Sequence, residues 1–236
     1  MAVKNESGRA RPREMHTRAR EVIRHTGGIV RVKFPSTKNG RMIHCEGLLE
    51  LDAAYLFETS PRVKAYREQP ISISYPDGSK IRRYTPDFAV DLNSGTTVLL
   101  EIKPAARLAA DDIRHKFDCI KAYFQRREQA FEILTDILIR TQPRLDAARS
   151  VHRHASHQLT SAAALEIALQ RHRRGFPMSL RRRSDLLGKG SITPYCLLRA
   201  GLLRADTSVP LDDNAQLHLP EDFQSEQLLS ESELGF

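Results

Sequence analysis

The hydrophobic positions in the first half of the chain repeat with two different periods. Residues 46–57 are apolar on nearly every side of a helical turn, which predicts a well-buried helix. Residues 71–75 alternate between apolar side chains and serine, so this segment is expected to form a strand with one apolar face. The runs 81–90 and 96–102 are rich in β-branched and aromatic residues, and the turn-forming sequence at 93–95 predicts that they pair as a hairpin.

A helical period follows these strands. Ile113, Phe117, Ile120 and Phe124 recur at spacings of 4, 3 and 4 residues, which predicts an amphipathic helix. Residues 131–134 then indicate a further short strand. The order of helix, three strands, helix and strand favours an α/β fold in which a mixed sheet carries flanking helices.

The chain after residue 158 predicts a smaller unit of different architecture. Three helices are expected, over residues 160–173, 180–187 and 195–200. Ser179 suits the start of the second helix, and Thr193-Pro194 suits the start of the third. A hairpin that pairs residues 202–205 with 216–219 would complete a winged helix.

The third of these helices would be the usual DNA reader of a winged helix. It offers Tyr195 and Arg199 but is otherwise apolar, and the wing is acidic. Docking to a protein is therefore favoured over readout of bases. Arg181, Arg182 and Arg183 on the second helix are candidates for contacts to phosphate.

Charge is distributed unevenly over the 236 residues, although the net charge is +8. The first 204 residues carry all 37 basic and 21 of the 29 acidic side chains, a net charge of +16, whereas the last 32 carry −8. This asymmetry favours a nucleic-acid-binding body with an acidic tail. Three widely spaced cysteines and the lack of a membrane-spanning stretch or signal peptide predict a cytoplasmic protein.

Candidate chemistry lies on the two strands of the hairpin. Glu101 and Lys103 are two residues apart, so both side chains point to one face of their strand, and Asp87 on the partner strand can converge there. Two carboxylates and an ammonium on an apolar sheet suit a Mg²⁺ site for phosphodiester hydrolysis. This is the pattern of the PD-(D/E)xK nucleases. The alternative is a hairpin with an exposed Glu–Lys pair.

Glu50 is a carboxylate inside the apolar helix at 46–57, directly before the strands with the candidate site. We favour a metal-site role for it. The alternative is a side chain that faces solvent beside Ala54.

A longer series of motifs resembles the TnsA family over the whole chain. The family comprises the endonuclease subunits of heteromeric cut-and-paste transposases. The series consists of Gly47–Leu51, Arg67–Pro70, Thr85–Phe88, Glu101–Ala106 and Phe131–Asp136. The C-terminal winged helix is similar to that family's C-terminal domain.

The resemblance implies roles for individual residues. Glu50, Asp87 and Lys103 match the family's two catalytic acids and its lysine, while Glu101 stands where some members carry Gln. Gln69 matches a motif that is structural or positions the substrate. Asp87, Glu101 and the backbone carbonyl of Ile102 would hold Mg²⁺, for which Mn²⁺ can substitute, and Glu50 would hold or orient a second metal or its water.

The resemblance also implies partners and an activity. Members cut the non-transferred strand at the 5′ ends of a transposon. A DDE-type transposase, TnsB, cuts and joins the 3′ ends, and an AAA+ regulator, TnsC, binds the nuclease's C-terminal region. The expected location is the bacterial nucleoid. Two other functions stay open: a stand-alone restriction-type or junction-resolving nuclease, and a non-catalytic DNA-bound scaffold that recruits a regulator.

These arguments divide the chain into five segments. They are a basic N-terminal arm (1–28), a PD-(D/E)xK endonuclease domain (29–140), a linker (141–158), a winged-helix-like domain (159–219) and an acidic tail (220–236).

Overall fold

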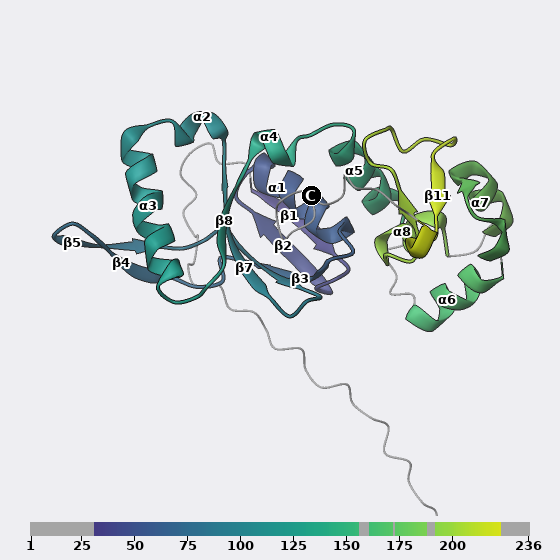
Figure 1. The fold of residues 1–236 in the computed structure, drawn as a ribbon, viewed down its shortest axis with the longest axis horizontal. Helices are drawn as coiled ribbons and strands as arrows, with labels where there is room; N and C mark the ends of the chain where they lie inside the picture. Colours follow the sequence, from purple (N-terminus) through teal and green to yellow (C-terminus); the bar gives the residue numbers. More distant parts are fainter. Residues whose placement is uncertain (1–30, 156–160, 172, 188–191, 223–236) are drawn as a thin grey trace, which may run out of the picture.

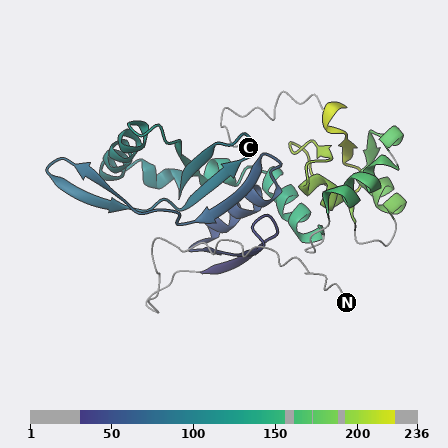
Figure 2. The same ribbon diagram turned by 90° about the horizontal axis from the view of Figure 1, so that it is seen from below.

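The computed structural model describes residues 31–155, 161–171, 173–187 and 192–222. The expected basic arm at 1–28 and residues 223–236 of the expected acidic tail lie outside the described residues. The described part is elongated, with a larger α/β unit at one end and a smaller helical unit at the other (Figure 1). Helix α5, within the segment expected to be a linker, lies between them (Figure 2).

A four-stranded mixed sheet forms the centre of the larger unit. Its order is β3-β6-β7-β8, in which β3, β6 and β7 are antiparallel neighbours and β8 runs parallel to β7. The strands are β3 (Val63–Glu68), β6 (Phe88–Leu92), β7 (Thr97–Lys103) and β8 (Phe131–Thr135). The mixed α/β architecture expected from the sequence is confirmed.

Helices pack on both faces of this sheet. Helix α3 (Asp111–Gln125) buries Phe117, Ile120 and Phe124 against Leu99 on one face, as its spacing of apolar residues predicts. Helix α1 (Leu48–Thr59) lies on the other face, where Leu100 belongs to the same core cluster. Alternate residues of β7 thus enter two separate cores.

Helix α5 (Arg144–His154) is packed on α1. Leu145 and Ala148 are buried in the α1 core. Asp52 of α1 is buried and accepts ion pairs from Arg140 and Arg149, at 2.8 and 2.7 Å. Two short helices, α2 (Ala105–Leu108) and α4 (Asp136–Ile139), complete the connections on either side of α3 and β8.

A small hairpin covers the outer side of α1. It consists of β1 (Val32–Ser36) and β2 (Arg41–Cys45), with Phe34, Ile43 and Cys45 buried in the α1 core.

The prediction of one continuous strand over residues 81–90 is wrong, because this segment contains parts of two strands. Strand β5 (Lys80–Tyr84) ends before Thr85-Pro86, and β6 begins at Phe88. Proline lacks the N–H that a ladder requires and restricts the residue before it, so the strand breaks there. Asp87 therefore lies in the segment that leads into β6 rather than on a strand.

The expected membership of the sheet also needs correction. Strand β4 (Ile73–Asp77) pairs only with β5, and this two-stranded hairpin projects beyond the sheet beside α3 (Figure 1). Its place at the sheet edge is taken by β3, a strand that the sequence patterns above do not predict. The buried Glu68, ion-paired with Arg41 at 2.6 Å, interrupts the apolar alternation that would have revealed this strand.

In the residues that the structure describes, the smaller unit contains three α-helices and a three-stranded sheet of order β10-β11-β9. Its elements are α6 (Ala162–Gln170), η1 (Arg173–Gly175), β9 (Met178–Ser179), α7 (Leu180–Leu187), α8 (Pro194–Arg199), β10 (Arg204–Ala205), β11 (Gln216–His218) and η2 (Pro220–Asp222). The Thr193 hydroxyl accepts from the Cys196 N–H, as the expected cap predicts. The expected hairpin is present as β10 and β11, with β9 as an added third strand.

One expectation about the basic residues of this unit changes. Arg183 is fully buried, and its guanidinium donates to the Ala168 carbonyl, so it is not available to phosphate. Arg181 and Arg182 remain exposed. Helix α8 packs against α5, with Tyr195 close to the His154 ring and Arg199 donating to the Thr37 hydroxyl at 3.3 Å.

Candidate active site

Asp87 is fixed at the point where β5 gives way to β6. Its carboxylate oxygen Oδ2 accepts the Ile102 N–H of β7 at 2.7 Å. Its backbone carbonyl accepts the Gln69 N–H at 2.8 Å. Because the ladder is interrupted at Pro86, Asp87 is hydrogen-bonded to β7 through its side chain instead of its backbone.

Glu101 and Lys103 lie on the same face of β7, as their spacing predicts. The Lys103 ammonium is 3.3 Å from Glu101 Oε1, and the Tyr84 hydroxyl donates to Glu101 Oε2 at 2.7 Å. Glu101 is only 5 % exposed, and each oxygen of this buried carboxylate has one of these two partners. Burial, with the nearby Glu101 charge, raises the pKa of Tyr84, which remains a donor.

Glu50 approaches from the first turn of α1 and accepts the Glu46 N–H at 2.7 Å. Burial raises its pKa to about 7, and the charges of Glu46 and Glu101 act in the same direction against the backbone hydrogen bond. A carboxyl group facing open solvent would not be perturbed in this way. The structure therefore favours the site-facing position of Glu50 over the solvent-facing alternative.

Three carboxylates thus share one electrostatic environment. The pKa of Asp87 is raised well above its usual range by burial and by the charges of Glu101 and Glu50, while the Ile102 N–H and Lys103 oppose the shift. The charge of Lys103 alone does not balance three carboxylates. Hard oxygen donors with uncompensated charge suit Mg²⁺ or Mn²⁺. The donor set fits a divalent ion, although its oxygens are not all within 4.8 Å of one another.

The Ile102 carbonyl lies on the same edge. The N–H and C=O of one strand residue point to the same side, and the Ile102 N–H is directed at Asp87. The β6–β7 register ends at the pair Phe88 and Leu100. The Ile102 carbonyl therefore emerges just beyond the ladder, on the side of Asp87.

Gln69 is joined to the site through the backbone of Asp87 and through the side chain of Glu46. Its backbone has a left-handed φ of 45°, and its side-chain amide donates to Glu46 Oε1 at 2.8 Å. Because Glu46 in turn donates its N–H to Glu50, Gln69 connects the backbone of Asp87 to the support of Glu50. This arrangement fits the structural alternative for Gln69.

Sequence reasoning assigned no role to four residues near this site. They are Glu46, Arg83, Tyr84 and Lys116. A cavity of about 480 Å³ lies beside Asp87 and Glu101 and is lined also by Arg83, Tyr84 and Lys116. Lys116 lies over the rings of Tyr84 and Phe117. The amphipathic helix carries basic residues between its apolar positions, and this pattern is the sequence signal that could have pointed to Lys116. In the structure, Lys116 lines the cavity beside the site.

Comparison with known protein families gives a match within the larger unit. Residues 60–136 match the family described as TnsA-like endonuclease N terminal. The matched segment contains Gln69, Asp87, Glu101 and Lys103, whereas Glu50 lies before it. The match supports a TnsA-type endonuclease. No match was found among curated proteins. Within the described ranges, no helix is both long and apolar enough to span a membrane.

Proposed function

We propose that this chain, with its TnsA-like endonuclease domain at residues 60–136, hydrolyses the non-transferred DNA strand at the 5′ ends of a transposon in Tn7-like transposition. The observation that carries the proposal is that Glu50, Asp87 and Glu101 act on one another electrostatically, with Lys103 beside Glu101, inside or beside the matched segment. Two of these carboxyl groups have raised pKa values.

The proposed metal ligands are Asp87, Glu101 and the Ile102 carbonyl, with Glu50 as ligand or orienting group for a second ion or its water. A bound Mg²⁺ supplies charge neutralisation at the phosphate and a water of lowered pKa. Asp87 is preoriented by the Ile102 N–H, and Glu101 by the Tyr84 hydroxyl. Both contacts fix ligand oxygens before substrate arrives, which is the usual role of such supporting groups.

Lys103 has a separate role in the proposal. Its ammonium lies beside Glu101, and it is partly exposed to the site. A cation in this position orients the attacking hydroxide and offsets the charge that develops on the phosphorane. Lys116 and Arg83, on the walls of the adjoining cavity, are placed to hold the DNA backbone.

The proposed partners are a TnsB-type DDE transposase and a TnsC-type AAA+ regulator. The order of elements in the smaller unit, helix, strand, two helices and two strands, supports a winged-helix fold for residues 159–219. Because α8 is packed on α5, its contact with DNA bases is disfavoured, and docking to a protein is the role we propose for this unit. The division into arm, nuclease, linker, winged helix and tail remains our proposal for the domains.

The test is strand-resolved cleavage of end-labelled transposon DNA with the transposase and regulator present. We expect Asp87→Asn and Lys103→Ala each to abolish 5′-strand cleavage while joining of the 3′ ends continues. Asp118→Asn, an exposed carboxylate on α3, is the matched control and should cut normally. Normal 5′ cleavage by Asp87→Asn would refute the site. Cleavage of unrelated DNA without any partner would instead support a stand-alone nuclease, and an inactive wild type would support a scaffold.

A further inference from the structure

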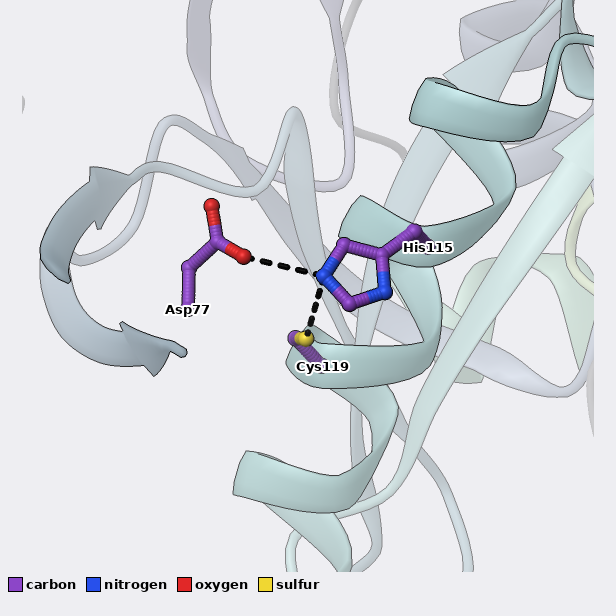
Figure 3. A group of neighbouring side chains, drawn as sticks. All are labelled: Asp77, His115 and Cys119. Atoms are coloured by element: carbon purple, nitrogen blue, oxygen red, sulfur yellow. Dashed lines mark hydrogen bonds and ion pairs between the residues drawn. The ribbon is translucent and has the colours of Figure 1, made fainter. Parts of the chain in front are cut away.

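A second group of potential metal ligands lies between the projecting hairpin and helix α3. Asp77 ends β4 beside the tight turn of the hairpin, where it pairs with Lys80. His115 and Cys119 lie one turn apart on α3, so both face the hairpin. The ligand atoms of all three residues are within 4.8 Å of one another (Figure 3).

The contacts within this group converge on one ring nitrogen. His115 Nε2 is 2.9 Å from Asp77 Oδ1 and 3.7 Å from Cys119 Sγ (Figure 3). In a nucleophilic triad the thiol or hydroxyl and the acid contact opposite nitrogens of the imidazole. Here both contact the same nitrogen, so the arrangement does not build a catalytic relay.

Two of the three separations instead resemble edges of a tetrahedral ion site, and the third, between Asp77 and Cys119, is within 4.8 Å. Ligands at the usual zinc bond lengths would lie about 3.3 Å apart for nitrogen and oxygen and about 3.6 Å apart for nitrogen and sulfur. The observed separations differ from these values by less than about half an ångström. A small movement of the side chains is therefore enough to admit an ion.

The chemistry and surroundings of the three donors favour zinc. One imidazole, one thiolate and one carboxylate, with a fourth position open to water, form a donor set suited to Zn²⁺ rather than to Mg²⁺. Arg82 donates to Asp77 Oδ2 at 3.0 Å, which orients the carboxylate and leaves Oδ1 directed at His115. His115 is largely exposed and Cys119 is half-buried, so an ion can enter from solvent.

We propose that Asp77, His115 and Cys119, with water as the fourth ligand, form a Zn²⁺ site that fixes the tip of the β4–β5 hairpin to helix α3. The base of the hairpin is already held, because Tyr75 and Tyr84 pack with Phe117 in one apolar cluster. An ion at the tip restrains the other end. This site is separate from the proposed nuclease centre, and the proposal holds whether or not the chain cleaves DNA.

Co²⁺ is the probe for this site, because thiolate coordination gives a near-ultraviolet charge-transfer band and tetrahedral coordination gives intense visible bands. Saturating Mg²⁺ is added to occupy the oxygen-ligand centre. We expect the full-length wild type to bind one Co²⁺ with a thiolate band that Zn²⁺ displaces. Cys119→Ser should abolish the band, and His115→Ala should weaken binding more than about tenfold.

Asp111→Asn is the control for Asp77→Asn, since Asp111 is an exposed carboxylate on α3, the helix that carries His115 and Cys119, and lies outside the group. Asp111→Asn should keep the wild-type affinity, whereas Asp77→Asn should lose at least about tenfold. Zn²⁺ should also raise the melting temperature of the wild type but not of Cys119→Ser, with circular dichroism confirming that the variant is folded. An unchanged thiolate band in Cys119→Ser, or no thiolate band in the wild type, would overturn the proposal.

Discussion

At the residue scale, burial gives Glu50 an unusual affinity for a proton. Its pKa rises from 4.5 to about 7, and the pKa of Asp87 is raised in the same direction. Below pH 4.5 the carboxyl is protonated in both the folded and the unfolded chain. Between 4.5 and about 7 the unfolded chain releases a proton that the folded chain keeps. The free energy of unfolding therefore falls as pH rises through this window in the absence of metal.

We predict that Glu50→Gln flattens this dependence, because the amide cannot titrate. Urea unfolding from pH 4.5 to 8 in the presence of a chelator measures it. A remaining slope of the same sign is expected from Asp87. Asp111→Asn changes a carboxyl that is 97 % exposed and should retain the wild-type slope. An undiminished slope in Glu50→Gln would mean that this carboxyl is not buried as described.

Tyr84 is the clearest functional candidate that sequence patterns missed. We predict that Tyr84→Phe raises the Mg²⁺ concentration for half-maximal cleavage by about tenfold, because Glu101 loses the hydroxyl that fixes one of its oxygens. Tyr75→Phe is the matched control, since Tyr75 is buried in the same apolar cluster. Equal metal requirements in the two variants would remove Tyr84 from the site.

The sequence identified the acidic and basic residues of the site but not their supports. The two-residue period placed Glu101 beside Lys103, and the motif series drew attention to Glu50 and Asp87. The roles of Tyr84 and Glu46 were not predicted, because they depend on contacts between different elements. A local pattern of apolar and polar residues carries no information about such contacts. The Tyr84 hydroxyl reaches Glu101 across 17 positions, and Glu46 joins Gln69 across 23.

At the scale of elements, local periodicity predicted what local energetics decide. The helix over 113–124 and the Thr193 cap were correct, since each depends on residues within a few positions. Strand partners were not predictable in this way. The β4 strand has the expected alternation, yet it lies outside the central sheet because its partner β5 is separated from β6 by the break at Pro86. Strand β3 was missed because its inward-facing Glu68 is satisfied by a distant arginine.

The projecting hairpin has one basic strand. Lys80, Arg82 and Arg83 are exposed on β5, and Arg83 lines the cavity beside Asp87. If this strand follows the DNA backbone, Lys80→Gln with Arg83→Gln should reduce the slope of log affinity against log salt by about 2. Binding to labelled duplex DNA at several salt concentrations measures this slope. Arg62→Gln with Lys64→Gln, two exposed residues at the start of β3, is the matched pair, and an equal effect of both pairs would show that the hairpin has no special contact.

At the scale of the whole molecule, the two units are joined by direct packing as well as by the chain. Helix α8 contacts α5, the Thr193 hydroxyl donates to the His154 carbonyl, and Gly201 lies against Pro61 of the larger unit. Gly201 has a left-handed φ of 73°, and a Cβ at this position would lie 2.7 Å from the Pro61 Cβ. Glycine is thus required both for backbone conformation and for close approach of the units.

We predict that Gly201→Ala lowers the melting temperature by about 2–8 °C from backbone strain alone, with a further loss from the collision with Pro61. Gly95→Ala separates the two effects, because Gly95 also has a positive φ but has open space around its Cβ position. The larger fall should therefore occur in Gly201→Ala. Adding Pro61→Gly should restore part of the loss in Gly201→Ala and none in Gly95→Ala, as a double-mutant cycle measures. Identical losses in the two alanine variants, with no rescue by Pro61→Gly, would show that this contact does not hold the units together.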